Sequence, residues 1–511
     1  MTPPSIVALR PGALTFEQLR SLATSAHKVV LDEGCWPGVE AAQAVIEAAA
    51  RGAAPVYGIN TGFGKLATTR IAPDQIEELQ RRLVLSHMCG IDPALPDPVV
   101  RLVLALKAAS LALGHSGVRR RTIELLLALL EHDALPVIPA KGSVGASGDL
   151  APLAHLAGAL IGVGEVRLGG TAMPAATALA RIGEQPLTLA AKEGLALLNG
   201  TQVSSALALL GLFRAQAVFD AALLAGAMSV DAALGSDVPF DPRLNAVRGQ
   251  PAQIRVAKRL AALLAGSAIR ASHLVECERV QDPYSLRCQP QVMGACLELL
   301  DGAAAVLERE ANGVSDNPLV FAPQSPDDAG AILSGGNFHG EPVALAADQI
   351  ALALAEIGSL AERRIALLTD PNLSQLPAFL TPEPGLNSGF MLPQIAAAAL
   401  ASENQHLAHP VGIDSRPTSA NQEDHVSMAT YAARRLLEMA DNAAHIVAIE
   451  LLAAAQGIEL RRPLQSSAPL EAALARVREH AVFLTEDRPL AAEIAAVAGE
   501  VLRGAFARIS A

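Results

Sequence analysis

The segment KGSVGASGDLAPLAH, residues 141–155, is the most distinctive part of this chain. Its first half is rich in glycine and serine, which favour turns over the interiors of helices and strands. Its second half is apolar and contains Pro152, which a helix tolerates in its first turn. The sequence therefore predicts a polar turn that leads, after Asp149, into an apolar helix ending near Gly162.

Ala146, Ser147 and Gly148 form the centre of this turn. Because Gly148 has no Cβ, the backbone can bend sharply enough to bring the Gly148 amide nitrogen against the Ala146 carbonyl carbon. That attack closes a five-membered ring, loss of water aromatises it, and loss of the Ser147 hydroxyl leaves an exocyclic methylidene group. The three residues could thus become an electrophile made from backbone alone. An ordinary turn and an anion nest of backbone N–H groups are the competing interpretations.

Residues 141–155 resemble the prosthetic-group loop of the aromatic amino acid ammonia-lyase and aminomutase family. In that family Ala-Ser-Gly becomes 4-methylideneimidazol-5-one (MIO) autocatalytically, so no separate cofactor is needed. The resemblance extends from Ala13 to about Pro463, and the family members that act on histidine are the most similar. It implies that Ala146, Ser147 and Gly148 form MIO and act in catalysis.

The composition favours a large helical protein. The chain has 511 residues, of which 51% are hydrophobic and only 3% aromatic, so close-packed helices are more probable than a β-sandwich. The net charge is -12, which argues against binding to nucleic acid or to an anionic membrane surface.

The sequence shows no sign of secretion or of a membrane span. The first residues, MTPPSIVALRPG, lack a charged segment followed by an apolar core. No apolar run reaches the ~18 residues that a membrane span needs. The cysteines are odd in number and form no CxxC pair, so reduced thiols in a cytoplasmic protein are predicted for Cys35, Cys89, Cys277, Cys288 and Cys296.

Apolar residues that recur three and four positions apart predict a mainly α fold. The predicted organisation is a loop-rich N-terminal domain, residues 1–203, with the MIO loop and the Tyr57 loop, followed by a long, largely antiparallel helical bundle with C-terminal helices, residues 204–511. Thr201 is predicted to cap a long helix that reaches about Ala225. Further predicted elements are a hairpin at 166–174 and helices at 15–26, 39–51, 251–264, 291–312, 341–369 and 394–406.

Tyr57 and Tyr284 are two of only three tyrosines, and both lie in polar segments that contain glycine or proline. By the resemblance, Tyr57 removes the substrate β-proton, while Tyr284 and Asn199 hold the carbonyl oxygens of the MIO ring. A tyrosine taken alone is more often a packed ring with a satisfied hydroxyl. A phenol is a poor base near neutral pH, because its reference pKa is about 10. Helices that start after Gly148 and Gly200 would present positive ends that stabilise a phenolate.

The string QDPYSLRCQPQ begins at Gln281 and contains Tyr284 and Arg287. The planar, permanently charged guanidinium of Arg287 suits a bidentate grip on the substrate carboxylate, although an isolated arginine is usually a surface residue. The resemblance also makes Gln281 a substrate-binding residue and places Phe338, in the SGGNFHG loop, in the substrate site near the ring.

His87 and Glu423 indicate which amino acid binds. In family members that act on phenylalanine or tyrosine, the pair at Ser86-His87 is generally Phe-Leu or His-Leu, and the segment around Glu423 lacks the glutamate. An imidazole and a carboxylate can both hydrogen-bond to a substrate imidazole, and polar groups reject an apolar ring that leaves them unpaired. The predicted reaction is elimination of ammonia from L-histidine to give trans-urocanate, the first step of histidine degradation. Taken alone, His87 is more often a structural helix residue and Glu423 a solvated charge.

Other functions were weighed against this one. A serine hydrolase is disfavoured because Ser147 lies in GASGD, not in a G-x-S-x-G elbow. A non-catalytic helical scaffold explains the bundle but not the polar loops. A lyase or 2,3-aminomutase acting on phenylalanine or tyrosine stays open as an alternative. A metal hydrolase lacks an HExxH motif, so no metal is predicted despite His406, His409, His425, Glu403 and Asp424.

The predicted partner is a small amino acid substrate, with neither nucleic acid nor membrane. The resemblance also implies a homotetramer whose active sites combine residues from several subunits. Tyr57, Ser147 and Tyr284 therefore need not meet within one chain.

Overall fold

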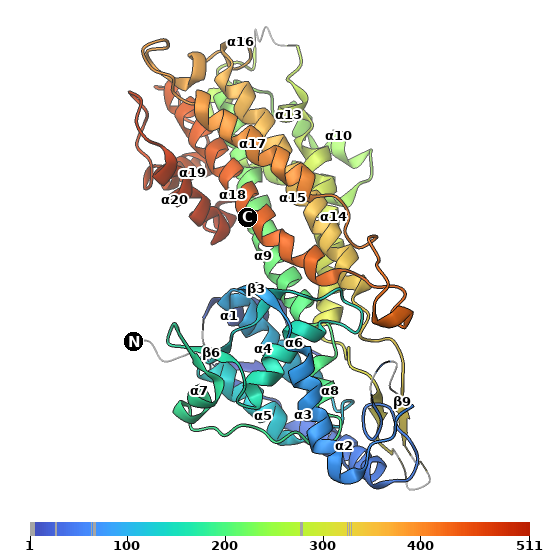
Figure 1. The fold of residues 1–511 in the computed structure, drawn as a ribbon. Coiled ribbons are helices and arrows are strands. Elements are labelled where there is room, and N and C mark those ends of the chain that lie inside the picture. The colour runs from blue at the N-terminus through green and yellow to red at the C-terminus, as the bar shows by residue number, and fades with distance from the viewer. Residues whose placement is uncertain are drawn as a thin grey trace. The chain divides into compact units, whose positions relative to one another are not determined.

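The computed structural model describes residues 6–510 apart from 26–27, 63, 65–67, 276–279, 324, 326–327 and 329. Cys277, for which a reduced thiol was predicted, lies outside the described residues. The mainly α prediction is confirmed, since helices dominate the described chain and strands form only small sheets (Figure 1). The other four cysteines are all free thiols, as predicted: Cys35, Cys89, Cys288 and Cys296.

The longer helices carry most of the fold, and two of them have the predicted bounds of 251–264 and 341–369. The set is α1 (Phe16–Thr24), α2 (Trp36–Arg51), α3 (Ile76–His87), α4 (Asp97–Leu111), α5 (Arg120–Glu131), α6 (Leu150–Leu160), α9 (Gln202–Ala232), α11 (Pro251–Leu264), α14 (Gln289–Ala311), α15 (Glu341–Thr369), α17 (Met391–Leu407), α18 (Ala429–Leu460), α19 (Ala468–Arg478) and α20 (Ala491–Leu502).

Short helices connect these long ones. They are α7 (Ala175–Arg181), α8 (Glu193–Leu198), α10 (Pro242–Ala246), α12 (Ala268–Ala271), α13 (Tyr284–Arg287), α16 (Pro371–Ser374) and α21 (Ala507–Ser510). Of these, α8 matters most for function, because it ends beside Asn199.

The strands pair locally. β1 (Ile6–Leu9) and β2 (Lys28–Leu31) are parallel, β3 (Ile91–Ala94) pairs with β5 (Pro139–Lys141), and β8 (Leu319–Phe321) pairs with β9 (Ala331–Leu333). The predicted hairpin is confirmed as β6 (Glu165–Leu168) and β7 (Thr171–Pro174), which β4 (Leu135–Pro136) extends to three strands.

Two helices differ from their predicted bounds for physical reasons. α2 starts at Trp36, not at residue 39, because Pro37 stands in its first turn, where the fixed φ of proline favours a helix start. α9 continues beyond residue 225 to Ala232, because the residues that follow remain buried and, apart from Ser229 and Asp231, carry no polar side chain.

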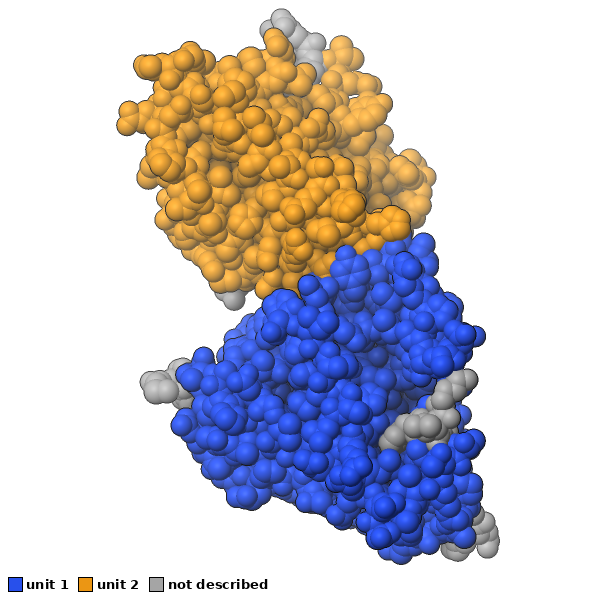
Figure 2. All heavy atoms as spheres, viewed as in Figure 1, with its two compact units in different colours: residues 1–210, 304–348, 410–434 blue, residues 211–303, 349–409, 435–511 orange. Residues whose placement is uncertain are grey.

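The chain divides into two compact units, each assembled from three segments (Figure 2). The first unit contains residues 1–210, 304–348 and 410–434, and the second contains residues 211–303, 349–409 and 435–511. The sequence-based division at residues 203 and 204 did not include the return of two later segments to the first unit. Those returning segments carry Phe338 and Glu423, two of the predicted site residues.

In the first unit, α4 is the central helix. Every residue from Leu102 to Leu111 is buried, and α4 packs against α1 and α5. Helices α3, α6 and α8 pack against one another and carry the turn that contains Ser147 at their edge. The apolar half of the 141–155 segment therefore forms a buried helix, α6, and its polar half forms the turn that precedes this helix.

In the second unit, parts of α9, α14, α15 and α18 lie side by side (Figure 1). A buried ion pair joins two of them: the Arg364 guanidinium in α15 donates to the Glu450 carboxylate in α18, with Nε 2.5 Å from Oε1. Ser229 in α9 donates to the same carboxylate at 2.7 Å. Both charged side chains are fully buried, so this polar group links three helices inside an apolar bundle.

Four helices, α9, α14, α15 and α18, are long and apolar enough to cross a membrane by length and composition alone. The expectation that no segment reaches this size is therefore wrong. The reason is that a helix in the middle of a bundle is apolar around most of its circumference, as a membrane helix is. In α9, α15 and α18 the most apolar window is 78%, 72% and 83% buried within the protein, whereas in α14 the share is 39%.

Candidate active site

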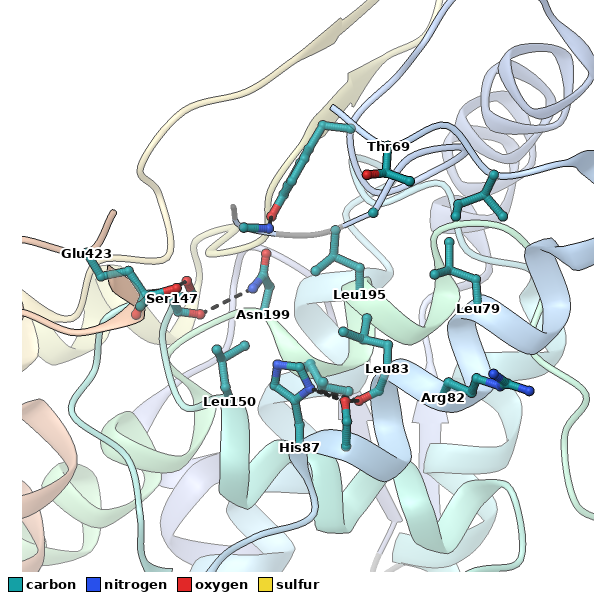
Figure 3. A pocket seen from close by; sticks show the side chains of 17 residues that line it. Thr69, Leu79, Arg82, Leu83, His87, Ser147, Leu150, Leu195, Asn199 and Glu423 are labelled. Atoms are coloured by element: carbon teal, nitrogen blue, oxygen red, sulfur yellow. Dashed lines mark hydrogen bonds between the residues drawn. The ribbon is translucent and has the colours of Figure 1, made fainter. Parts of the chain in front are cut away.

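A cavity of about 690 Å³ in the first unit has Ser147 in its wall (Figure 3). Its walls come from the loop after α2, from α3, from the start of α6, from α8 and from the 419–423 loop. Five of the residues predicted from the sequence line it: Tyr57, His87, Ser147, Asn199 and Glu423. The fold thus brings together side chains that are far apart in the sequence.

The backbone around Ser147 doubles back on itself. One backbone bridge pairs Ala146 with Gly148, and a second pairs Gly148 with Gly200. Gly148 has a φ of +76°, and a Cβ at this position would lie 2.2 Å from the Gly200 carbonyl oxygen. Only glycine fits this conformation and this close approach. The residues present therefore fit the cyclisation that yields MIO, in which the Gly148 nitrogen must reach the Ala146 carbonyl carbon.

Asp149 anchors the far end of the turn. Its buried carboxylate accepts hydrogen bonds from the Ser204 amide at 2.7 Å, the Ser204 hydroxyl at 2.9 Å and the Thr430 hydroxyl at 2.6 Å. Burial raises the pKa of Asp149, and these hydrogen bonds oppose that rise. Its amide also donates to the Gly200 carbonyl at 2.8 Å. The Ser147 turn is thereby attached both to α9 and to the start of α18.

Asn199 and Glu423 contact Ser147 directly. The Asn199 side-chain amide donates to the Ser147 carbonyl oxygen at 3.3 Å (Figure 3), a contact that its predicted role requires. The Ser147 hydroxyl donates to Glu423 Oε1 at 3.1 Å. The other oxygen of Glu423 accepts from the Thr418 hydroxyl at 2.7 Å, and backbone hydrogen bonds also pair Thr418 with Glu423. The Glu423 carboxylate is therefore held beside the Ser147 hydroxyl, the group that would be lost if MIO formed.

His87 is the last residue of α3, and its ring faces the cavity (Figure 3). Its Nδ1 lies 2.8 Å from the Leu83 carbonyl oxygen, a group that can only accept. In the neutral imidazole this contact places the proton on Nδ1 and leaves Nε2 as an acceptor. An acceptor in this position suits the N–H of a substrate imidazole.

Tyr57 lies on a loop that is held by Asn60. The buried Asn60 side chain accepts from the Val56 amide at 2.7 Å and donates to the Ala54 carbonyl at 2.9 Å. The Tyr57 hydroxyl lies 3.5 Å from the Gly64 amide and reaches the cavity. The phenol is thus presented to the same space as Ser147, as its predicted role requires.

Four of the residues predicted to bind the substrate do not line this cavity. Gln281, Tyr284 and Arg287 belong to the second unit, and Phe338, in the loop between β9 and α15, is half-buried in the first. Tyr284 is 69% exposed, and the Arg287 guanidinium lies 4.6 Å from the centre of its ring. The buried Nε of Arg287 has no hydrogen-bond partner within the described part of the chain.

One group of possible metal ligands lies among the described residues, namely His339, Glu341 and His425. Of the ligands considered from the sequence, only His425 belongs to it. Both nitrogens of the His339 ring face backbone groups, with Nε2 3.3 Å from the His425 carbonyl and Nδ1 3.4 Å from the Glu341 amide. A metal ion would have to displace one of these contacts, so the group serves to join two loops as it stands.

Lys107 was missed by the sequence analysis. It is 1% exposed in α4, and its amine donates to the Ala196 carbonyl at 2.9 Å and to the Asn199 carbonyl at 2.6 Å. The signal was present in the string LVLALKAASLAL, residues 102–113, where one lysine interrupts an apolar helix. A lysine in such a place needs buried partners, and here they lie beside the predicted site.

The pH dependence of stability is expected to report on Lys107. Burial lowers the pKa of its amine from 10.5 to about 7, although Asp316 and Asp149 favour the charged form. Between these two values the unfolded chain binds a proton that the folded chain has lost, so stability rises as the pH increases. The free energy of unfolding of the wild type, minus that of Lys107→Met, should increase by about 2 kcal/mol from pH 7 to pH 9 in urea titrations. A difference that is flat or falls with pH would contradict this assignment.

The sequence model described as aromatic amino acid lyase matches residues 14–479. The chain is a member of the aromatic amino acid lyase family. This confirms the resemblance inferred from residues 141–155, and it makes the cavity around Ser147 the candidate active site of an aromatic amino acid lyase.

Relatives within the lyase family carry more specific names. A histidine ammonia-lyase of Aromatoleum aromaticum is 60% identical over 502 residues, which cover 98% of this chain and 94% of the relative. A histidine ammonia-lyase of Rhodospirillum rubrum is 58% identical over 507 residues, which cover 99% of this chain and 97% of the relative. The crystal structure of histidine ammonia-lyase from Trypanosoma cruzi superposes with a TM-score of 0.91 at 40% identity, covering 99% of this chain and 95% of that one.

Proposed function

We propose that this lyase eliminates ammonia from L-histidine to give trans-urocanate. The observation that carries the proposal is the pairing of His87 and Glu423 in one cavity with Ser147. The two relatives named as histidine ammonia-lyases, at 60% and 58% identity, support the same substrate. Phenylalanine is not favoured, because its apolar ring would leave these polar groups without partners.

We further propose that Ala146, Ser147 and Gly148 cyclise to MIO. The Gly148 nitrogen attacks the Ala146 carbonyl carbon, the carbonyl oxygen leaves as water, and the Ser147 hydroxyl leaves as a second water. Glu423 accepts the hydrogen bond of that hydroxyl at 3.1 Å, and Asn199 donates to the Ser147 carbonyl at 3.3 Å. Once formed, the group supplies an electrophilic methylidene carbon that captures the substrate amine. The protein requires no separate cofactor in this scheme.

The roles of the remaining residues follow from their positions. The Nε2 atom of His87 accepts the N–H of the substrate imidazole, and Glu423 binds the imidazole or moves its proton. Tyr57 removes the β-proton, which it can do only as a phenolate. The positive N-terminal end of α6, whose first residue Leu150 lines the cavity, favours negative charge there.

The carboxylate clamp is proposed to come from another subunit of a homotetramer. Within one chain, Gln281, Tyr284 and Arg287 do not line the cavity around Ser147. Tyr284 is 69% exposed, and the buried Nε of Arg287 has no hydrogen-bond partner among the described residues. Both features are expected of side chains that bind a ligand or another subunit. The apolar window of α14 is only 39% buried, which suits coverage by a neighbouring chain. Phe338 lines the substrate site in this proposal.

The decisive experiment is to incubate the purified protein separately with L-histidine, L-phenylalanine and L-tyrosine. Ultraviolet absorbance and released ammonia are followed together. Urocanate and ammonia from histidine alone support the proposal. A cinnamate-type product from another amino acid, or a β-amino acid without net release of ammonia, would instead indicate the lyase or aminomutase alternative.

Cytoplasmic location remains a prediction, and cell fractionation of the source organism tests it.

Replacing His87 by leucine is expected to lower kcat/KM for histidine by about tenfold to a hundredfold, which corresponds to the loss of one buried hydrogen bond to the substrate. The effect on phenylalanine should be smaller or of opposite sign, so the ratio of the two kcat/KM values is the quantity to measure. His132→Leu, at an exposed histidine after α5, is the matched control and should leave that ratio unchanged. An equal loss for both amino acids would remove His87 from substrate selection.

A further inference from the structure

Lys107 is a buried cationic side chain that the reaction scheme above does not use. Its neighbours in α4 are apolar and buried, so its transfer from water into this core is costly. Among the described residues it forms no ion pair, because Asp316 is already held by Lys192 at 2.6 Å. Its direct partners are instead the carbonyl oxygens of Ala196 and Asn199. The position of this lysine therefore needs an explanation in terms of those two carbonyls.

Both carbonyls lie at the C-terminal end of α8. The last carbonyls of a helix have no partner within it, and a cationic side chain is a favourable cap. Here the cap comes from a different helix, α4, and binds at 2.9 Å and 2.6 Å. The amine has three N–H groups when charged and two when neutral, so it can donate to both carbonyls in either state. Lys107 thus determines where the backbone runs as it leaves α8.

The same backbone supports the Ser147 turn. The Asn199 side chain donates to the Ser147 carbonyl at 3.3 Å, and the Gly200 carbonyl accepts from the Asp149 amide at 2.8 Å. Gly148 approaches Gly200 so closely that no Cβ fits between them. Residues 199–200 are therefore the surface on which the turn lies, and a shift of this surface moves the turn with it.

We propose that Lys107 is a positioning residue for the prosthetic-group turn, acting through the Asn199 backbone. It holds residues 199–200 so that the Gly148 nitrogen can reach the Ala146 carbonyl and so that Asn199 can hold the Ser147 carbonyl afterwards. Lys107 touches neither the substrate nor the reacting atoms. The inference rests on the proposed function, since it concerns the formation and placement of the same electrophile.

The test compares Lys107→Met with Arg101→Met. Arg101 lies on the same helix, is largely buried and binds Asp133. Its replacement therefore also removes a cationic side chain from α4, but one that binds Asp133 instead of the Asn199 carbonyl. The protein is purified in its natural assembly, and two quantities are measured per folded chain. The first is the fraction of chains whose intact mass shows the loss of two waters, and the second is the pair kcat and KM for histidine.

Lys107→Met is expected to reduce the fraction of cyclised chains and to lower kcat by about a hundredfold, because small misplacements of reacting groups have effects of this size. KM should change little, since the substrate-binding groups do not touch Lys107. Lys107→Arg, which keeps the donors, should recover part of kcat. Arg101→Met should retain the wild-type values for both quantities.

Wild-type mass loss and kcat in folded Lys107→Met would overturn the proposal. So would a variant whose only defect is a lower yield of folded protein, because Lys107 would then serve stability alone. Where Lys107→Met gives no folded protein, Lys107→Gln carries the test, since its amide keeps two N–H donors on a shorter side chain and should show an intermediate kcat. If the wild type itself shows neither the mass loss nor urocanate, the proposed function fails irrespective of Lys107.

Discussion

Replacing Ser147 by alanine is expected to abolish formation of the methylidene group and to reduce turnover of histidine by at least about a thousandfold. Alanine has no hydroxyl, so the second water cannot be lost and no methylidene carbon can arise. The Glu423 carboxylate also loses the hydroxyl that donates to it at 3.1 Å. Intact-mass measurement should show no chains that have lost two waters, and the activity assay should show no urocanate above the uncatalysed rate.

Ser143→Ala is the matched control for this substitution. Ser143 belongs to the same turn, and its hydroxyl accepts from the Gly145 amide at 3.1 Å and makes two longer contacts, at 3.4 Å to the Gly148 carbonyl and 3.5 Å to Asp149. Its loss should leave ring formation intact and turnover within about tenfold of wild type, as expected for the loss of one ordinary hydrogen bond within the turn. Ser147→Ala protein that still converts histidine at a similar rate would show that the electrophile does not arise from this serine.

The sequence was informative about the site wherever chemistry limits the choice of residue. The Ala146-Ser147-Gly148 turn was recognised by the resemblance of residues 141–155 to the prosthetic-group loop of the family, and its carbonyl, its hydroxyl and its missing Cβ are the features that formation of MIO would use. The cavity walls contain His87 and Glu423, which suggested a polar substrate ring because family members that act on phenylalanine or tyrosine generally differ at these positions. Their roles remain predictions until the variants are assayed.

The supporting residues could not be found by the same reasoning. Lys107 is separated from Asn199 by 92 positions, and the sequence around either residue does not predict that the two are in contact. Thr418 and Thr430 likewise act through tertiary contacts, to Glu423 and to Asp149. Such partners are set by how helices pack, and periodicity along the sequence does not encode which polar groups meet.

The fold, too, was predictable from the sequence in some parts and not in others. Helices with long apolar faces were predicted well, and α11 and α15 have the expected bounds. The return of residues 304–348 and 410–434 to the first unit was not foreseen, because no change of composition marks the points where the chain passes between units. This return matters for function, since it brings the Glu423 loop to Ser147.

Replacing Glu450 by glutamine is expected to destabilise the second unit by about 3 to 5 kcal/mol, because it leaves the Arg364 guanidinium buried without a counter-charge. Arg364 and Glu450 are both fully buried. Urea denaturation followed by circular dichroism should show the lower free energy of unfolding. Glu124→Gln, which breaks the exposed Arg120–Glu124 pair, is the control and should cost less than about 0.5 kcal/mol.

The double substitution Arg364→Met with Glu450→Met separates the cost of an unpaired charge from the value of the pair itself. Replacing both partners by apolar side chains removes the desolvation cost together with the attraction, so the double variant should be more stable than Glu450→Gln. The loss in the single variant would then come mainly from the buried arginine. A double variant as unstable as Glu450→Gln would show instead that the pair, with the Ser229 hydroxyl that donates to it at 2.7 Å, contributes net stability that packing cannot replace.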